Sequence, residues 1–256
     1  DYLVNRLDNL PERIAPYKKF APLANQWFAD EGIVVIKNAT LTIPFEMFCG
    51  GRTMVKFMRD LYTIPDKVQA AMDVAIDALI ESAANQLRAS KPLCAWVGGW
   101  RSASEFLNKK FWDRFVWPYF KRLADTVIQA GVVPIFHLDS NWDRDMENFK
   151  DFPSGKCVMS TDGSTDIYRV KELLGGRMCI MGDVPPALTA LGTPDEVYNY
   201  CLKQINEIGP SGYMLSTGCN IPANAKADNL KAMIAAARVN CKRECNREEV
   251  NATRKK

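Results

Sequence analysis

The single histidine of the chain, His137, carries the clearest chemical signal in the sequence. It lies near the end of an apolar, strand-like run, and Asp139 follows two residues later, so an extended backbone turns both side chains to one face. Cys219 follows another such run. Imidazole nitrogen, carboxylate oxygen and thiolate sulfur are ligand types that zinc accepts, and three protein ligands with one open position are typical of catalytic zinc. We therefore predict a zinc site at these three residues, where the metal would lower the pKa of a bound thiol or hydroxyl.

The same three residues have a purely structural interpretation. A histidine at a strand end is often only hydrogen-bonded, an aspartate two residues on often caps a turn, and a cysteine is often buried without a role. Spacing alone leaves this alternative open. Trp96, Trp100, Trp112 and Trp117 are in the same way expected to pack in the core rather than to surround a ligand.

Polar and aromatic residues also follow the other strand-like runs. Functional groups in parallel α/β proteins gather just beyond the carboxyl ends of the strands. On this rule Asp183 and Arg101 are predicted to be catalytic, and Arg101 could hold an anionic group of the substrate. A salt bridge or a loop cap is the alternative role for both. The predicted substrate-binding residues are Trp100, Arg101, Asn141 and Asp162.

Six short apolar runs alternate with longer helical patterns, and these elements would position the candidate residues. Uninterrupted apolar runs of this length suit parallel strands that are buried on both faces. The predicted strands are GIVVI from Gly32, PLCAWV from Pro92, VVPIFHL from Val132, KCVMS from Lys156, RMCIMG from Arg177 and YMLST from Tyr213.

The helical patterns have recognisable starts. Pro65 fits the first turn of a long helix that runs toward Ser90. Thr193 to Glu196 combines an N-cap, a first-position proline and a capping-box glutamate. Residues 1–31 have helix-like spacing and no convincing strand. Further helices are predicted over residues 104–130, 166–174 and 227–239.

This order of strands and helices fits an open doubly wound sheet or a closed eight-stranded barrel. No GxGxxG or Walker-type loop follows a strand, which argues against a nucleotide-binding sheet. Residues 1–240 are predicted to form one domain, and residues 241–256 a charged C-terminal tail.

The overall composition limits the classes of partner. The net charge is only +3 and no basic stripe stands out, so nucleic acid is not an expected partner. No apolar run approaches the ~20 residues that span a bilayer, and Asp1 begins no recognisable signal peptide. A soluble, cytoplasmic protein with no membrane partner is therefore expected.

The cysteines are predicted to be reduced. Cys94, Cys157 and Cys179 lie inside apolar runs, which is typical of buried thiols rather than disulfides. Cys241 and Cys245 share a helical face, but no second cysteine pair or nearby histidine completes a zinc motif there.

From Phe111 to about Val239 the chain resembles the uroporphyrinogen decarboxylase superfamily, which includes cobalamin-dependent methyltransferases. A fainter match covers residues 32–60 and 92–104. The resemblance implies an α/β fold of the (β/α)8 TIM-barrel type, with the first two strands of the barrel absent from this chain. The segments that carry it are FWDRFVWPYFKRLADTVIQAGVVPIFHLDSNW, GGRMCIMGDVPP, LGTPDEVYNYCLKQI and GYMLSTGCNIPANAKADNLKAMIAAA.

The resemblance also distinguishes two branches of the superfamily. Its methyltransferases hold zinc with a His-x-Cys pair after the fifth strand and a cysteine in a GCG-like turn after the last strand. His137 matches that histidine, Cys219 in STGCNIP matches the later cysteine, and Asp139 replaces the first cysteine with another acceptable ligand. The decarboxylase ordinarily has a histidine near the position of Cys219, and its RQAGRY-like segment is not found here.

The favoured hypothesis is a methyltransferase component. It would move a methyl group between a small methylated or thiol substrate and a corrinoid (cobalamin) carried by a partner protein. The alternatives are a uroporphyrinogen decarboxylase that acts without a cofactor, and a non-catalytic barrel subunit. A barrel without two strands would have exposed sheet edges, so an oligomer or a companion chain is expected to cover its open side.

Overall fold

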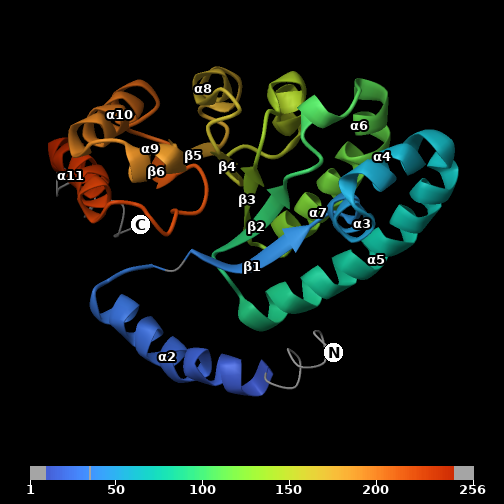
Figure 1. Ribbon diagram of the computed structural model, residues 1–256, viewed down its shortest axis with the longest axis horizontal. Helices are drawn as coiled ribbons and strands as arrows, with labels where there is room; N and C mark the ends of the chain where they lie inside the picture. The colour runs from blue at the N-terminus through green and yellow to red at the C-terminus, as the bar shows by residue number, and fades with distance from the viewer. Residues whose placement is uncertain (1–9, 35, 245–256) are drawn as a thin grey trace.

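The computed structural model describes residues 10–34 and 36–244, and six strands form one parallel sheet in it. The strands lie side by side in chain order from β1 to β6, with helical connections between them (Figure 1). The strands are β1 (Lys37–Thr42), β2 (Cys94–Gly99), β3 (Val133–Leu138), β4 (Val158–Thr161), β5 (Cys179–Val184) and β6 (Tyr213–Thr217).

The helices surround the sheet, except for α2, which lies apart from the others in Figure 1. In the described part of the chain, no helix is both long and apolar enough to cross a bilayer. The helices are α2 (Leu10–Asp30), α3 (Pro44–Arg52), α4 (Met54–Thr63), α5 (Pro65–Ser90), α6 (Lys109–Phe115), α7 (Trp117–Gln129), α8 (Ile167–Leu174), α9 (Pro186–Leu191), α10 (Pro194–Glu207) and α11 (Ala227–Glu244), with 3-10 helices η1 (Ser104–Phe106) and η2 (Asp143–Asp151).

The strand predicted at residues 32–36 is wrong in position, because β1 follows that run. Ile33 and Val34 are exposed, whereas Ala39 and Leu41 of β1 are buried in the core. KNATLT has only two apolar side chains, an alanine and a leucine, so its pattern is weaker than that of the neighbouring apolar run. Along β1, buried Ala39 and Leu41 flank the exposed Thr40. Packing of these two side chains in the core, rather than local hydropathy, therefore decides which segment forms the strand.

The helix predicted over residues 104–130 is wrong as a single element. It consists of η1, α6 and α7. The Asn108 side chain accepts a hydrogen bond from Phe111 N and caps the start of α6. Pro118 has no N–H to donate, so the chain restarts as α7 after Val116.

The other helix starts are confirmed. The long helix α5 runs from Pro65 to Ser90. Thr193 and Glu196 form the predicted capping box of α10, in which each side chain bonds to the other's backbone. The Asp166 side chain caps α8. Helix α11 continues beyond residue 240 to Glu244, and residues 245–256 of the predicted tail lie outside the described residues.

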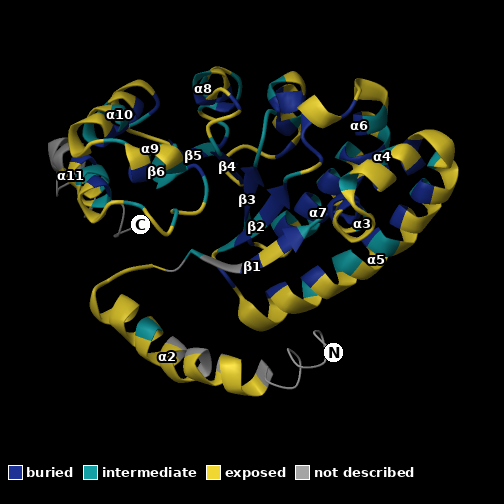
Figure 2. Cartoon of the chain, in the orientation of Figure 1, coloured by how far each residue is buried: buried dark blue, intermediate teal, exposed yellow. Residues whose placement is uncertain are grey.

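An aromatic cluster packs β3 against α7 and η2. The ring of Phe120 lies 5.4 Å from Phe136, 6.1 Å from Trp142 and 5.6 Å from Phe149, and all four side chains are fully buried. Tilted and edge-to-face rings at this spacing are favourable. Strands β2 and β3 are mostly dark blue in Figure 2, which marks their burial. This packing fixes β3 and the loop that follows it.

The opposite face of the sheet has an apolar layer below the carboxyl ends of the strands. Trp96 lies opposite Ile135, and Ile135 lies opposite Val158 in the parallel register. Two residues further along β3 and β4, on the same face of the sheet, the paired residues His137 and Ser160 are polar. The sheet thus changes from apolar to polar toward its carboxyl end. In the described residues, β1 and β6 are each paired on one side only.

Replacement of Phe120 by alanine should destabilise the fold by about 3–5 kcal/mol, because it removes a buried ring from the aromatic cluster. Phe20 of α2 is 56% exposed and is the matched control, so Phe20→Ala should change stability by less than about 0.5 kcal/mol. Urea unfolding followed by circular dichroism measures both. Equal losses for the two variants would contradict the packing described here.

Candidate functional site

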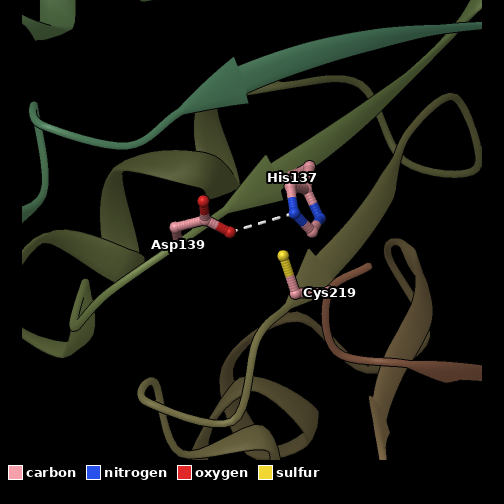
Figure 3. Close-up of side chains that lie close together, drawn as sticks. All are labelled: His137, Asp139 and Cys219. Carbon is pink, nitrogen blue, oxygen red and sulfur yellow. Dashed lines mark ion pairs between the residues drawn. The ribbon is translucent and has the colours of Figure 1, made fainter. Parts of the chain in front are cut away.

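His137, Asp139 and Cys219 meet at the carboxyl ends of β3 and β6 (Figure 3). His137 Nε2 lies 3.0 Å from Asp139 Oδ1, and the potential ligand atoms of the three residues all lie within 4.8 Å of one another. His137 is buried, and the other two are half-buried. The fold therefore brings together the three residues that the sequence analysis singled out as zinc ligands.

The imidazole of His137 is held on two sides. Its Nδ1 atom lies 3.2 Å from Ser160 Oγ on β4, which leaves Nε2 directed at Asp139. The ring of Trp96 packs against it, with 4.3 Å between centroids and 34° between planes. Metal-binding histidines usually have their second ring nitrogen hydrogen-bonded in this manner, because the bond fixes the tautomer and the ring orientation. Sequence reasoning did not find Ser160.

The carboxylate of Asp139 has an oxygen without a hydrogen bond. Oδ1 is buried and has no hydrogen-bond partner among the described residues, although His137 Nε2 is 3.0 Å away, so the contact has the distance but not the directionality of a hydrogen bond. An unsatisfied buried acceptor is unfavourable by about 1–3 kcal/mol. A tetrahedral zinc ion at ~2.1 Å from each atom would separate nitrogen and oxygen by about 3.4 Å. The donor set and its spacing fit such an ion.

The turn that carries Cys219 depends on close backbone contacts. Gly218 N donates to Val184 O at 2.9 Å, and Thr217 Oγ1 donates to Cys219 O at 2.8 Å. A Cβ atom at Gly218 would lie 2.7 Å from Asp162 O, which is too close for any side chain. Glycine at this position therefore allows the turn to lie against the loop after β4 and directs Cys219 toward His137.

A pocket of about 340 Å³ opens beside the three residues. Its volume is at the lower end of the range of about 300–1,000 Å³ for small-molecule sites. A larger pocket of about 870 Å³ lies at the other end of the strands, between the ends of α5 and α7, away from the candidate ligands. The smaller pocket is lined by Trp96, His137, Ser216, Thr217, Cys219, Asn220 and Ile221.

The loop after β2, with Trp100 and Arg101, is built on the buried carboxylate of Glu46 in α3. Glu46 accepts hydrogen bonds from Trp100 N at 2.8 Å, Arg101 N at 3.1 Å, and both N and Oγ of Ser102. The Arg101 guanidinium is 46% exposed and lies 3.7 Å from the same carboxylate. Neither Trp100 nor Arg101 lines the pocket beside Cys219. No local pattern in the sequence marks Glu46, because its partners lie more than 50 residues away.

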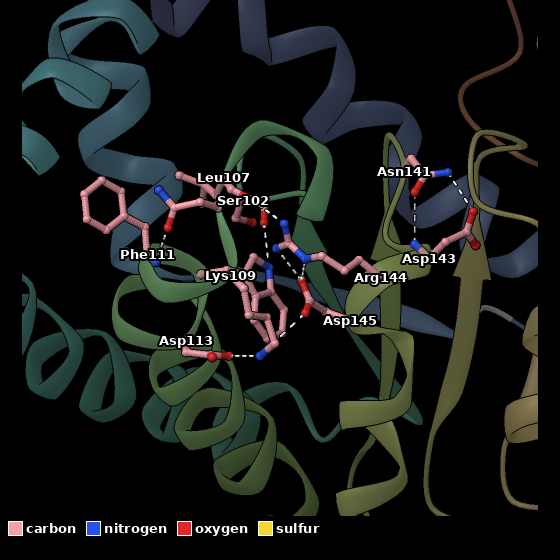
Figure 4. Close-up of polar contacts among 11 residues, drawn as sticks. Ser102, Leu107, Lys109, Phe111, Asp113, Asn141, Asp143, Arg144 and Asp145 are labelled. Carbon is pink, nitrogen blue, oxygen red and sulfur yellow. Dashed lines mark hydrogen bonds and ion pairs between the residues drawn. The ribbon is translucent and has the colours of Figure 1, made fainter.

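Asn141 and Asp162 connect the loops after β3 and β4. Asp162 accepts hydrogen bonds from Ser140 N at 2.9 Å and Ser164 N at 2.8 Å. The amide of Asn141 donates to Ser164 O and to Asp143, the second of which is visible in Figure 4. Ser140 has a positive φ of 69°, which its bond to Asp162 helps to hold. Both residues thus support the loop that begins with Asp139.

An ion-pair network around the buried Asp145 anchors the next segment, η2, to α6 (Figure 4). The side chain of Asp145 is completely buried and accepts hydrogen bonds from Arg144. Lys109 Nζ lies 3.7 Å from the same carboxylate, and Arg144 Nη1 donates to Leu107 O. Sequence reasoning did not identify this network, which holds the loop after β3 in place.

The carboxylate of Asp183 faces α10 rather than the pocket. It is 2% exposed and accepts hydrogen bonds from Tyr200 Oη at 3.0 Å and from Gln204 Nε2. Burial raises the pKa of Asp183, and these two hydrogen bonds oppose the rise. The structure therefore separates Asp183 from the group formed by His137, Asp139 and Cys219.

The other described cysteines lie outside the group formed by His137, Asp139 and Cys219. All six described in atomic detail are free thiols, as predicted for Cys94, Cys157 and Cys179. A raised pKa makes a thiol a poor source of thiolate and therefore a poor ligand. The Cys241 side chain and all of Cys245 lie outside the described residues. Burial raises the pKa of five thiols: Cys49 to about 11, Cys157 to about 12, Cys201 to about 11, and also Cys94 and Cys179.

Comparison with known proteins matches residues 29–239 to the family model described as uroporphyrinogen decarboxylase (URO-D). A methylcobamide:CoM methyltransferase of Methanosarcina acetivorans is 23% identical over 186 residues, which cover 70% of this chain and 51% of that protein. A uroporphyrinogen decarboxylase of Geobacter metallireducens is also 23% identical, over 199 residues that cover 75% of this chain and 56% of that protein. The chain thus spans about half the length of the curated relatives it matches.

A solved methyltransferase from Methanosarcina mazei superposes with a TM-score of 0.64 at 18% identity. The match covers 77% of this chain and 56% of that chain. Together with the six parallel strands in chain order, it confirms the predicted fold class, a partial barrel of the (β/α)8 type.

Burial of Asp183 should make stability fall as pH rises. Its folded-state pKa is raised, so the protonated form contributes stability below the unfolded pKa, and this is lost as pH rises through the folded pKa. Asp183→Asn keeps an oxygen acceptor for Tyr200 and Gln204. It should therefore lose less stability than the wild type as pH rises above about 4, the unfolded pKa of an aspartate, in urea unfolding.

The exposed Asp151 supplies the control, and Asp151→Asn should keep the wild-type pH dependence. If Asp183→Asn shows that dependence too, the described environment of Asp183 is incorrect.

Proposed function

The chain belongs to the uroporphyrinogen decarboxylase family, and we propose that it is a methyltransferase component of that family. In this proposal it transfers a methyl group between a small methylated or thiol substrate and a corrinoid carried by a partner protein. The observation that carries the proposal is the convergence of an imidazole, a carboxylate and a thiol beside a small pocket. The methyltransferases among the similar proteins support it.

We propose His137, Asp139 and Cys219 as the ligands of a zinc ion. The carboxylate and a thiolate would balance the double charge of the metal, and the unsatisfied Asp139 Oδ1 would gain a partner. When bound, zinc would supply Lewis-acid activation of the heteroatom of the substrate. The remaining position of a tetrahedral site would face the substrate.

The residues around the ligands would fix their geometry. Ser160 orients His137, so that Nε2 rather than Nδ1 is available to the metal. Gly218 lets the Cys219 turn lie close to the loop after β4. Trp96 and Ile221 give the pocket apolar walls, which would exclude water from the reacting heteroatom.

The other candidate residues would line the rim of the site or hold its loops and strands in place. Trp100 and Arg101 lie on the loop that Glu46 holds, where they would contact the substrate or the partner protein at the rim of the site. Asn141 and Asp162 would hold the loop of Asp139. Asp183 would keep β5 and α10 in register behind the site.

Partner and location follow from the same proposal. A corrinoid protein would approach the carboxyl ends of the strands, where the ligands lie. Within the described residues β1 and β6 are each paired on one side only, and an oligomer or a companion chain would cover these two edges. A cytoplasmic location agrees with the six free thiols of the described residues.

Uroporphyrinogen decarboxylation is the second candidate, because decarboxylases match the chain at the same identity as methyltransferases. It needs a cavity that stabilises a protonated pyrrole, and no metal. Incubation with uroporphyrinogen and analysis of the products decides between the two. Formation of decarboxylated porphyrinogens would show that the chain is a decarboxylase and would contradict the methyltransferase proposal.

Metal content tests the ligand set directly. We expect the wild-type chain to retain about one zinc ion after dialysis, and His137→Ala or Cys219→Ala to bind it at least about 100-fold more weakly, as measured by elemental analysis and competition with a chelator. Cys94→Ala removes a half-buried thiol outside the site and should leave zinc binding unchanged.

The same variants separate metal binding from catalysis. Zinc-loaded wild type should demethylate methylcobalamin in the presence of a small thiol, and Cys219→Ala should be slower by a factor of about 100 or more. Absence of zinc from wild type, or undiminished binding in Cys219→Ala, would rule out the zinc mechanism.

A further inference from the structure

The pocket beside His137 and Cys219 lacks positive charge. Among the described residues that line it, none is a lysine or an arginine. Besides the candidate ligands His137 and Cys219, its polar side chains are those of Ser216, Thr217 and Asn220. These three are uncharged and cannot neutralise an anion, and the two hydroxyls already donate to backbone carbonyls.

Two arginines at the carboxyl end of the sheet are already paired with carboxylates. The Arg101 guanidinium lies 3.7 Å from Glu46, which is 3% exposed. Arg144 bonds to the buried Asp145 at 2.6 Å. Each cation therefore offsets a buried negative charge, and neither side chain lines the pocket beside Cys219.

Negative charge lies close to the pocket. With a dication bound, Asp139 and the Cys219 thiolate would leave a neutral centre. The backbone of Asp162 packs against Gly218, one residue before Cys219. The Asp162 carboxylate is bonded to backbone N–H groups of Ser140 and Ser164, and no ion pair neutralises it within the described residues. A negative charge without a compensating cation among the described residues therefore lies on the loop that packs against the Cys219 turn.

Trp96 adds an aromatic wall. Its indole packs against the imidazole of His137 with the two rings tilted by 34°, and it lines the same pocket. The face of an indole attracts cations, and the interaction strengthens when water is excluded. Ile221 supplies an apolar surface in the same pocket.

We infer that this pocket takes a small uncharged or cationic compound with a thiol or methylated heteroatom, and discriminates against anionic ones. The inference rests on the proposed function, and it names the charge class of the substrate that this function would use. It follows from the cation-free lining, the pairing of Arg101 with Glu46 and the aromatic face of Trp96.

Three thiols of similar length test the inference: 2-mercaptoethylamine, 2-mercaptoethanol and 2-mercaptoethanesulfonate. Binding to the zinc-loaded chain is measured by calorimetry, and to the cobalt(II)-substituted chain by the thiolate charge-transfer band, with affinities corrected for the pKa of each thiol. The sulfonate should bind about tenfold or more weakly than the other two, and this penalty should shrink as salt is added.

Sulfonate binding as tight as that of 2-mercaptoethanol would overturn the inference and leave the proposed function intact. A chain that holds metal but binds none of the thiols would overturn both. The readout is binding, so it does not depend on turnover with the corrinoid partner.

Variants of Trp96 test the aromatic wall. Trp96→Leu should remove the advantage of the amine over 2-mercaptoethanol, whereas Trp96→Phe, which keeps a ring, should retain part of it. Trp27 of α2 is 63% exposed, and Trp27→Leu should leave all three affinities unchanged. Metal content and melting temperature are measured for each variant. An unchanged amine advantage in folded, metal-loaded Trp96→Leu would contradict the assigned role of Trp96.

Discussion

The parallel register between β3 and β4 is the constraint on which the site depends. It places Ser160 opposite His137, so that one imidazole nitrogen is occupied and the other is directed at Asp139. A shift by one residue would turn His137 toward the helices and replace it with an apolar neighbour. The aromatic cluster around Phe120 on the outer face of the sheet holds β3 against such a shift. Packing on one face thus fixes chemistry on the other.

Buried carboxylates fix the positions of the loops around the site. Glu46 accepts hydrogen bonds from the backbone of the loop after β2, Asp145 of η2 forms an ion pair with α6, and Asp183 of β5 accepts a hydrogen bond from α10. Glu46 and Asp183 each accept hydrogen bonds from more than one residue, and Asp145 is paired with Arg144 and Lys109, which is the condition for a charged group to be buried without a large loss of stability. The loops can therefore be irregular and still position Cys219 and Asp139 with little freedom. The glycine at 218 completes this arrangement, since its contact with Asp162 leaves no space for a side chain.

Period-two spacing was sufficient to predict that His137 and Asp139 share a face, because this geometry is local to one strand end. The helix at Thr193 was predictable for the same reason, since a capping box is complete within four residues. Glu46 and Ser160 were not, because their roles exist only after distant segments pack together. The misplacement of β1 has the same origin: burial in the folded sheet, and not local hydropathy, decides which residues near Ile33 become the strand.

The central claim is that His137, Asp139 and Cys219 bind one metal ion together. X-ray absorption at the zinc edge measures that coordination shell most directly. We predict one sulfur at about 2.3 Å and the remaining ligands, nitrogen or oxygen, at about 2.0–2.2 Å, with the sulfur lost in Cys219→Ala. A shell without sulfur in the wild type, or one with two or more sulfurs, would contradict this assignment.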